Sequence, residues 1–272
     1  MAINISLDHM LTGLSDFEDS FQTPNKYSPP EFKKGYPDSI IIHYTAMKDG
    51  RSAAEVLCRE STKASAHLVI DQSGKVFQLA PFNHRTWHAG VSEYNGRKWY
   101  NHYAIGIEID NLGWMKKIDG KFSRADLDKE LEEYEVVKAR HWNTKVPFEY
   151  WAKYPEIQLD RVKEICKLLI QKYNIREILG HDEISPGRKQ DPGPAFPMEE
   201  FRRELLPSDR DQGGEEERVV TASKLNIRTT PNGTIAAQPL KKGTKVNVLE
   251  EKDDWVKVST EIEGWVHKDY IA

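Results

Sequence analysis

A polar segment near residue 210 constrains the fold of this chain more than any other feature of its sequence. Residues 206–218 (LPSDRDQGGEEER) are dense in charge and contain a Gly-Gly pair, a composition typical of a flexible linker. The sequence before this segment alternates between apolar runs and helical periodicity, whereas the sequence after it has short alternating strands and no helical period. We therefore expect two folding units, joined by a linker at 207–217, with a small all-β barrel at 218–272.

The region before the linker has the pattern of a mixed α/β domain, because strand-like runs are interleaved with helical ones. Apolar, β-rich runs that predict strands lie at 39–46 (SIIIHYTA), 65–80 (two strands joined by a turn), 102–110 (HYAIGIEID) and 176–181 (REILGH). Helical patterns lie at 51–60, where Ser52 and Glu55 form a capping-box signature, at 123–142 and at 156–175. Residues 1–38 are polar and contain several prolines, so we expect an extended arm over the surface of a domain spanning 39–206.

The composition argues against several kinds of partner. The 39 basic and 43 acidic residues give a net charge of −4 with no strongly basic half, so nothing indicates nucleic-acid binding. No apolar run approaches the roughly 20 residues that a membrane span needs. The N-terminus lacks the regions of a signal peptide, so we expect a protein that starts in the cytoplasm or whose export signal is absent from this sequence. Cys58 and Cys166 fall in helical patterns and are expected to be reduced core residues. Separately, we expect the protein to be a monomer.

A turn-rich loop at 180–196 (GHDEISPGRKQDPGPAF) places His181 ten residues before Asp191. A solvated surface loop would explain its prolines and glycines but does not require the histidine and the aspartate. With His43, near the end of a predicted strand, they provide two imidazoles and a carboxylate, the ligand set of a catalytic zinc site that keeps one position for water. Any one of these histidines alone is more often a core or surface residue, so the residues leave both interpretations open.

Two further residues could complete a hydrolytic site. Glu108 lies between isoleucines on an apolar run, and a charged residue is seldom buried without a partner. If its side chain faces the metal, its carboxylate can take the proton of the attacking water. Lys189, two residues before Asp191, can supply a cation for the developing oxyanion. These residues are compatible with a hydrolase that binds one zinc ion per chain.

Three segments resemble the N-acetylmuramoyl-L-alanine amidases of the AmpD type, within the type 2 amidase and peptidoglycan-recognition-protein superfamily. They are SAHLVIDQSGKVFQLAPFNHRTWHAGVSEYNG (65–96), IGIEID (105–110) and GHDEISPGRKQDPGPAF (180–196). The resemblance, from about residue 39 to 201, implies an α/β fold with a central mixed sheet flanked by helices. It implies zinc held by His43, His181 and Asp191, with Glu108 and Lys189 as the catalytic pair. The implied reaction cleaves the amide between N-acetylmuramic acid and the L-alanine of the stem peptide.

The resemblance also implies a substrate cleft, with two departures from the family pattern. The residues that match this cleft are Tyr44, His67, Trp87, His88, Arg97 and Asn101. Ala66 stands where phage-lysozyme-like and animal members have a tyrosine, which favours the AmpD-type arrangement with a glutamate as base. Tyr44 stands where AmpD-type proteins have an asparagine. Residues 112–151 fall outside the resemblance, and they either wall the cleft or simply pack.

The last part of the chain, 218–272, resembles a bacterial SH3 domain, a family that usually binds cell-wall peptides. Trp255, Trp265 and Tyr270 either form a binding face or are core aromatics of a small barrel.

Two classes of function follow from these resemblances: a zinc amidase acting on peptidoglycan or muropeptides, and a non-catalytic peptidoglycan-recognition protein. Because binding-only members usually lack a zinc ligand and this chain has all three, the sequence favours the enzyme. The missing signal peptide suits a cytoplasmic enzyme that recycles anhydro-muropeptides, whereas the SH3-like region suits an enzyme that acts on the cell wall. A lysin or an injected effector would satisfy both observations.

Overall fold

The chain folds into two units, residues 1–206 and 207–272. The computed structural model describes residues 3–206, 217–228, 230–231, 233–235, 238–252 and 255–260. Among these residues, no helix is both long enough and apolar enough to cross a membrane.

A six-stranded mixed sheet forms the centre of the first unit, in the order β17-β5-β11-β6-β7-β3. Its strands are β3 (Phe17–Glu18), β5 (Ser39–Tyr44), β6 (Leu68–Ile70), β7 (Val76–Gln78), β11 (Ala104–Ile109) and β17 (Glu177–Gly180). β17, β5, β11 and β6 run parallel to one another, and β7 is antiparallel to β6. The predicted mixed α/β fold is confirmed, and the strand runs of the sequence form five of the six strands of this sheet, from β17 to β7.

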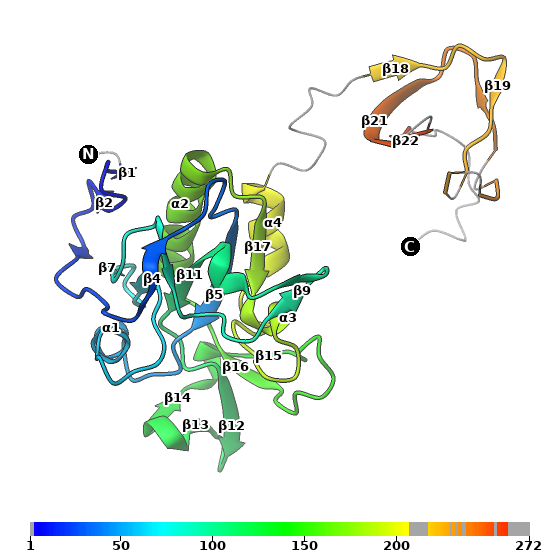
Figure 1. The fold of residues 1–272 in the computed structure, drawn as a ribbon. Helices are drawn as coiled ribbons and strands as arrows, with labels where there is room; N and C mark the ends of the chain where they lie inside the picture. Colours follow the sequence, from blue (N-terminus) through cyan, green and yellow to red (C-terminus); the bar gives the residue numbers. More distant parts are fainter. Residues whose placement is uncertain are drawn as a thin grey trace. The chain divides into compact units, whose positions relative to one another are not determined.

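The two faces of the central sheet have different coverings. Alternate residues such as Ile40, Ile42 and Ile107 pack in one core with α2 (Glu156–Tyr173) and α4 (Met198–Leu205), which lie together in Figure 1. The opposite face is covered at β6 and β7 by α1 (Gly50–Leu57). Near β5 and β17 it is covered by the segment around Ala89 and by α3 (His181–Ile184).

The N-terminal end of α1 differs from the prediction. The expected capping box began at Ser52, but the helix begins at Gly50 and Asp49 is its N-cap. The Asp49 carboxylate accepts a hydrogen bond from the backbone N–H of Ser52 at 2.7 Å. An aspartate satisfies the exposed N–H groups of a first turn as well as a serine does, which explains the earlier start.

Residues 3–38 are largely extended, but they are more than a surface arm. Ile5, in β1 (Asn4–Ile5), and Leu11, in β2 (Leu11–Thr12), are buried in the core that contains α2. β3 forms one edge of the central sheet, and β4 (Lys26–Glu31) pairs with β8 (His84–Thr86). The apolar residues spaced along this polar segment therefore anchor it to the domain.

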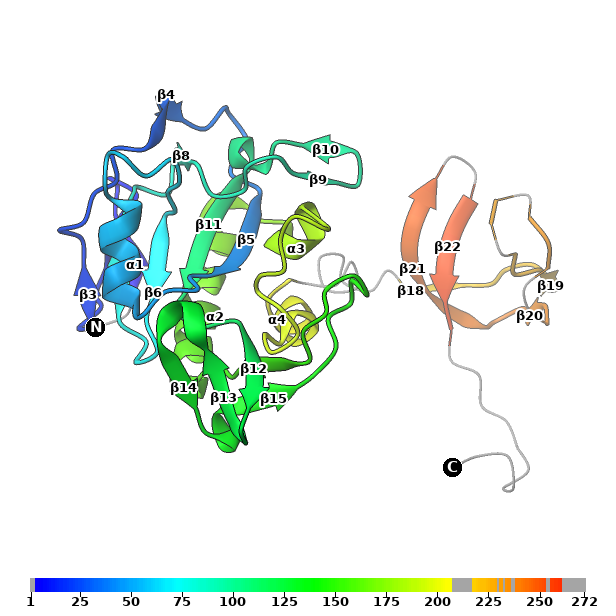
Figure 2. The same ribbon diagram turned by 90° about the horizontal axis from the view of Figure 1, so that it is seen from below.

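The predicted helix at 123–142 is wrong. This region belongs to a separate five-stranded sheet at the end of β11, visible in Figures 1 and 2, in the order β14-β13-β12-β16-β15. The strands are β12 (Trp114–Ile118), β13 (Lys121–Arg124), β14 (Lys129–Leu131), β15 (Val136–Lys138) and β16 (Tyr150–Ala152), with 3-10 turns η2 (Ala125–Leu127) and η3 (Glu133–Glu135).

The physical reason lies in residues that interrupt the helical pattern. Asp128 has a left-handed backbone (φ 50°), which turns the chain back so that Phe122 pairs with Leu131 across two strands. The helical pattern at 123–142 rests on the spacing of Leu127, Leu131 and Tyr134, but Tyr134 is 76% exposed. Leu127, in η2, and Leu131, in β14, instead pack against the small core of this sheet and do not share one face of a helix.

A β-hairpin projects from the domain beside α3, as Figure 2 shows. It consists of β9 (Glu93–Tyr94) and β10 (Arg97–Lys98) and leads into the 3-10 turn η1 (Tyr100–His102). The two cysteines are not paired with each other. Cys166 is fully buried in the core that contains α2, as predicted, whereas Cys58 is only partly buried.

The described part of the second unit contains only strands. β18 (Glu217–Val219), β21 (Lys245–Lys252) and β22 (Trp255–Ser259) form one antiparallel sheet, and β19 (Lys224–Leu225) pairs with β20 (Leu240–Lys241). Val220, Leu240 and Val246 form its core. Trp255 is partly buried, and Trp265 and Tyr270 lie outside the described residues.

Candidate active site

Two of the predicted site residues project from neighbouring strands of the central sheet. β5 and β11 are parallel, and Glu108 is the register partner of His43. Register partners place their side chains on the same face of a sheet. His43 and Glu108 therefore both lie on the face opposite α2, at the end of the sheet where β5 stops.

His181 and Asp191 reach the same place from the turn-rich loop. β17 ends at Gly180, and His181 opens α3 directly after it. The backbone N–H of Asp182 donates to the carbonyl of Asp191 at 2.8 Å, which closes the loop on itself. Pro186 and Gly187 sit at its turn, with Gly187 at φ 83°, a backbone conformation that favours glycine.

The three predicted metal ligands converge on one point. The Nδ1 atom of His43 lies 2.9 Å from Nδ1 of His181 and 3.1 Å from Oδ2 of Asp191, and His181 Nδ1 lies 2.9 Å from that same oxygen. All three side chains are buried. Within the described part of the chain, they are the one set of histidine, cysteine and acidic residues arranged to hold a metal ion. Two imidazole nitrogens and one carboxylate oxygen suit zinc.

The electrostatics of this cluster suit a cation. Burial, together with the neighbouring His181, lowers the pKa of His43 to about 4, so the His43 imidazole is neutral near pH 7. Burial alone would raise the pKa of Asp191, but the neighbouring His181 and His43 hold that pKa well below its usual range. The site therefore offers the neutral imidazole of His43 and the ionised carboxylate of Asp191 to a metal.

Glu108 lies in a different electrostatic environment. Burial and the nearby Asp191 carboxylate raise the pKa of Glu108 to about 8, whereas the ammonium of Lys189 acts to lower it. Lys189 also acts on His43 electrostatically. The structure thus brings the three predicted metal ligands together on the sheet face that carries Glu108, and Lys189 acts on Glu108 and His43 from the loop that bears Asp191.

Four of the six predicted substrate-binding residues are buried. The His67 ring has internal partners for both nitrogens: Nε2 donates to the His84 carbonyl at 2.7 Å, and Nδ1 accepts from the N–H of Gly106 at 3.0 Å. His88 and Asn101 are also buried, and the Asn101 side-chain oxygen accepts from the backbone N–H of His88 at 3.0 Å. Tyr44 is buried so close to Gly113 that a Cβ there would lie 2.5 Å from the Tyr44 ring.

The other two predicted substrate-binding residues differ in exposure and bonding. Arg97 forms a bidentate hydrogen bond with Asp38 at 2.8 and 2.9 Å and lies over the ring of Tyr103, so its guanidinium is occupied within the fold. Trp87 is partly exposed and makes an edge contact with Tyr27 of the N-terminal segment. This arrangement favours a supporting role for the buried residues and leaves Trp87 as a candidate for substrate contact.

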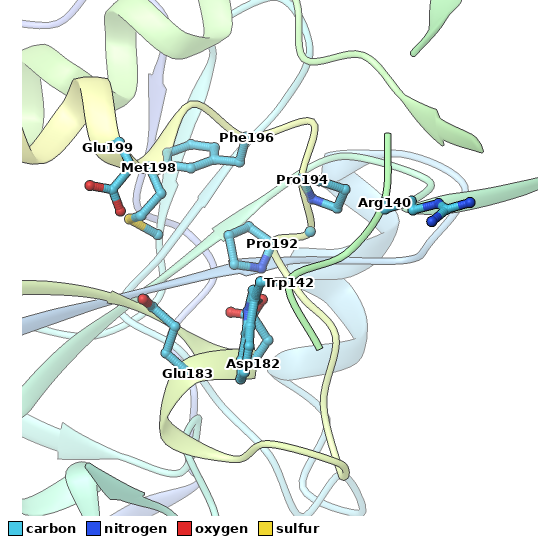
Figure 3. Close-up of a pocket in the computed structure, with 10 residues that line it drawn as sticks. Arg140, Trp142, Asp182, Glu183, Pro192, Pro194, Phe196, Met198 and Glu199 are labelled. Atoms are coloured by element: carbon cyan, nitrogen blue, oxygen red, sulfur yellow. Dashed lines mark hydrogen bonds between the residues drawn. The ribbon is translucent and has the colours of Figure 1, made fainter. Parts of the chain in front are cut away.

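A hydrogen-bonded contact between the inserted segment and α3 was not indicated by the sequence. Asp182, the residue after a predicted ligand, is buried and accepts a hydrogen bond from Trp142 Nε1 at 2.7 Å. His141 Nε2 lies 2.9 Å from the same carboxylate oxygen. Figure 3 shows Trp142 and Asp182 together, with Pro192 beside them. They line a cavity of about 350 Å³, whose lining also includes Phe196, Met198 and Glu199. No local sequence signal links positions 40 residues apart, so only the fold reveals this contact.

The comparisons with known proteins agree with this geometry. The family described as N-acetylmuramoyl-L-alanine amidase matches residues 33–194, which include every predicted metal and catalytic residue. The chain belongs to the N-acetylmuramoyl-L-alanine amidase family. Residues 223–272 of this amidase-family chain match the bacterial SH3 domain.

Several curated relatives in this amidase family are similar to the chain. The 1,6-anhydro-N-acetylmuramyl-L-alanine amidase AmpD of Haemophilus influenzae is 31% identical over 173 residues, covering 64% of this chain and 74% of that protein. The N-acetylmuramoyl-L-alanine amidase AmiD of Escherichia coli is 28% identical over 174 residues, covering 61% of this chain. The aligned region spans 52% of AmiD and 57% of E. coli AmpD, so the chain matches little more than half the length of these two relatives.

Two solved structures are also similar. A selenomethionine derivative of AmpD aligns over 71% of this chain and 96% of its own, with 21% identity and a TM-score of 0.47. E. coli AmiD in complex with anhydro-N-acetylmuramic acid-L-Ala-D-gamma-Glu-L-Lys aligns over 75% of this chain and 66% of its own, with 22% identity and a TM-score of 0.47.

Proposed function

We propose that this chain is a zinc-dependent hydrolase that cleaves the amide between N-acetylmuramic acid and L-alanine in peptidoglycan or its fragments. One observation carries the proposal: His43, His181 and Asp191 converge beside Glu108 in a member of this family. The names of the relatives support the choice of bond, since AmpD of H. influenzae is a 1,6-anhydro-N-acetylmuramyl-L-alanine amidase.

The proposed metal is one zinc ion, held by His43, His181 and Asp191. Their buried nitrogen and oxygen atoms lie within 4.8 Å of one another and match the ligands that zinc prefers. When bound, zinc supplies Lewis-acid polarisation of a carbonyl and lowers the pKa of a bound water to about 7.

Glu108 is the proposed general base. Its carboxylate lies on the same sheet face as His43, and general-base catalysis requires a carboxylate within reach of the attacking water. A cation bound at the three ligands would favour the ionised form of Glu108, because an opposite charge nearby lowers the pKa of a carboxyl group. Lys189 is proposed to stabilise the oxyanion that develops on the scissile carbonyl.

The buried histidines and Asn101 are proposed to hold the site in place, and Trp87, with its partly exposed ring, is proposed to contact substrate. The SH3-like unit is proposed to bind peptidoglycan and keep the amidase unit near it. A short flexible tether can raise the effective concentration of an enzyme at its substrate to the millimolar range.

The test of the proposed reaction is a digestion of two substrates with zinc-loaded protein. Purified sacculi and soluble anhydro-muropeptides are incubated with the wild type and with Glu108→Gln, and the products are identified by mass. We expect free stem peptides that begin with L-alanine, from the wild type alone. Binding to sacculi without release of any stem peptide would overturn the enzyme and favour a non-catalytic recognition protein.

The role of the SH3-like unit is tested by comparing the full chain with a chain that ends at Leu206. Because the first unit has its own core, the shortened chain should cleave soluble muropeptides at nearly the full rate and sacculi more slowly. Equal loss on both substrates would contradict a tethering role, and so would unchanged activity on sacculi.

A further inference from the structure

The second ring nitrogen of His43 has an unusual partner. Its Nε2 atom lies 3.1 Å from Nδ1 of His88, and the two rings meet edge to face with an interplanar angle of 88°. The Nε2 atom of His88 in turn lies 3.0 Å from the backbone carbonyl of Ala104 in β11. The Ala104 carbonyl, the His88 ring and the His43 ring thus form a continuous chain of polar contacts. This chain ends at the Nδ1 atom of His43, where the metal ligands converge.

The directions of these hydrogen bonds follow from the carbonyl. A carbonyl can only accept, so His88 Nε2 carries the hydrogen and donates to Ala104. A neutral imidazole has one N–H, which leaves Nδ1 of His88 as an acceptor. His43 Nε2 must then donate to His88, and the lone pair of His43 is left on Nδ1. This is the tautomer that a metal ligand bonding through Nδ1 needs.

The outer nitrogen of His181 has partners of both kinds. Its Nε2 atom lies 3.1 Å from the carbonyl of Ala89, which accepts, and 3.3 Å from Nη2 of Arg188, which donates. The line of contacts from Ala104 through His88 therefore concerns the tautomer of His43 alone.

The position of His88 is itself tightly determined. Its backbone N–H donates to the side-chain oxygen of Asn101 at 3.0 Å, and its ring packs on Gly106. A Cβ at Gly106 would lie 2.4 Å from Cγ of His88, so a larger residue would have to displace the ring. Because His88 is only 8% exposed, its ring serves the interior of the site and offers little surface to a substrate.

We propose that His88 is a positioning residue that presets His43 for metal binding, with the carbonyl of Ala104 fixing the proton and Gly106 providing the space. The proposal rests on the metal site of the proposed function. Groups that hold a metal-binding histidine by its outer nitrogen typically change metal affinity by about 10–100-fold when they are removed.

The central experiment compares two substitutions of His88 in the full chain. His88→Leu keeps an apolar side chain of moderate size but removes the acceptor. His88→Asn keeps an acceptor, because its Oδ1, like Nδ1 of histidine, is bonded to Cγ. We expect zinc affinity, measured by competition with a chromophoric chelator, to fall about 10–100-fold in His88→Leu and to be largely restored in His88→Asn. Circular dichroism and thermal melting identify any variant that does not fold.

A second measurement needs no metal. Nitrogen-15 NMR of the metal-free wild type distinguishes a protonated from an unprotonated ring nitrogen. We expect His43 and His88 both as Nε2–H tautomers, with a mixture of tautomers for His43 in His88→Leu. Gly106→Ala should give the same mixture, since it displaces the His88 ring.

Three results would overturn the proposal: His43 as the Nδ1–H tautomer in the wild type, equal zinc affinity in wild type and folded His88→Leu, or equal losses in His88→Leu and His88→Asn. A failure of the proposed function looks different. In that case the wild type would bind no zinc, while the tautomers of the metal-free protein would still answer the question about His88.

Discussion

The central sheet and the inserted sheet of β12 to β16 contribute to the candidate site in different ways. The central sheet places His43 and Glu108 side by side on one face, whereas the inserted sheet supplies none of the five proposed metal and catalytic residues. The inserted segment instead touches the supports of the site. Trp142 donates a hydrogen bond to Asp182. The ring of Trp151 packs so closely on Gly193 that a Cβ at Gly193 would lie 2.7 Å from this ring. The comparison separates residues that would perform the chemistry from residues that hold the loop bearing His181 and Asp191.

The largest effect is expected where the central sheet supplies a metal ligand. His43→Ala removes one of three ligand atoms, so we expect loss of stoichiometric zinc and of amidase activity below detection, measured by elemental analysis and muropeptide digestion. Asn143→Ala, in the inserted segment, serves as a control that should retain both. Full activity in His43→Ala would refute the assignment of the central sheet to the chemistry.

The next effect isolates proton transfer from metal binding. Glu108→Gln keeps the shape of the side chain but cannot accept a proton, so turnover should fall by about 10²–10⁴-fold. Zinc content should stay at one ion per chain. Steady-state rates on a soluble muropeptide measure the loss, and a rate near that of the wild type would show that Glu108 has a structural role only.

A smaller effect is expected in the pH dependence of the metal-free protein. The folded pKa of Glu108, about 8, lies above its unfolded value, so the folded state holds a proton that the unfolded chain releases. The contribution of Glu108 to stability is therefore present below the unfolded pKa and is lost as pH rises toward 8. Between pH 6.5 and 8 the wild type should lose about 1–2 kcal/mol of unfolding free energy relative to Glu108→Gln. Urea denaturation of both proteins at the two pH values checks this, and parallel curves would contradict a raised pKa.

The smallest effect concerns the hydrogen bond that Trp142, in the inserted segment, donates to Asp182. Trp142→Phe keeps the ring but removes the N–H that Asp182 accepts, and His141 stays beside the same carboxylate. Because Trp142 is 57% exposed, the loss should be about 1 kcal/mol of stability, with less than about a tenfold change in turnover. Tyr134→Phe, on an exposed residue of the same inserted segment, is the matched control. A loss of zinc in Trp142→Phe would mean that the inserted sheet determines the ligand geometry after all.

The convergence of the predicted metal ligands could be anticipated from the sequence because the chemistry of such residues is visible in short patterns. Glu108 stands out as an acidic residue between isoleucines, and the prolines and glycines around Asp191 indicate a fixed loop. Gly106 also gave a signal that was not used, since a glycine inside a strand often marks the close approach of another group.

The partners of the buried polar residues could not be predicted in the same way. The sequence indicates an open substrate cleft for His88, His67 and Asn101. Only their long-range hydrogen bonds show that these side chains are directed inward. The inserted sheet was misread for a related reason. Leu127 and Leu131 are four residues apart, which suits a helix, but the backbone reversal at Asp128 decides their arrangement.

The position of His43 relative to Glu108 depends on the register between β5 and β11. A slip of one residue between parallel strands would turn every side chain of the slipped strand to the opposite face. His43 and Glu108 would then point to opposite sides of the sheet, although most of the backbone hydrogen bonds could form again. During refolding, the return of secondary structure would not distinguish the two pairings, but the recovery of zinc affinity would. The delay between the recovery of secondary structure and the recovery of zinc affinity would measure how long misaligned strands persist before the native pairing forms.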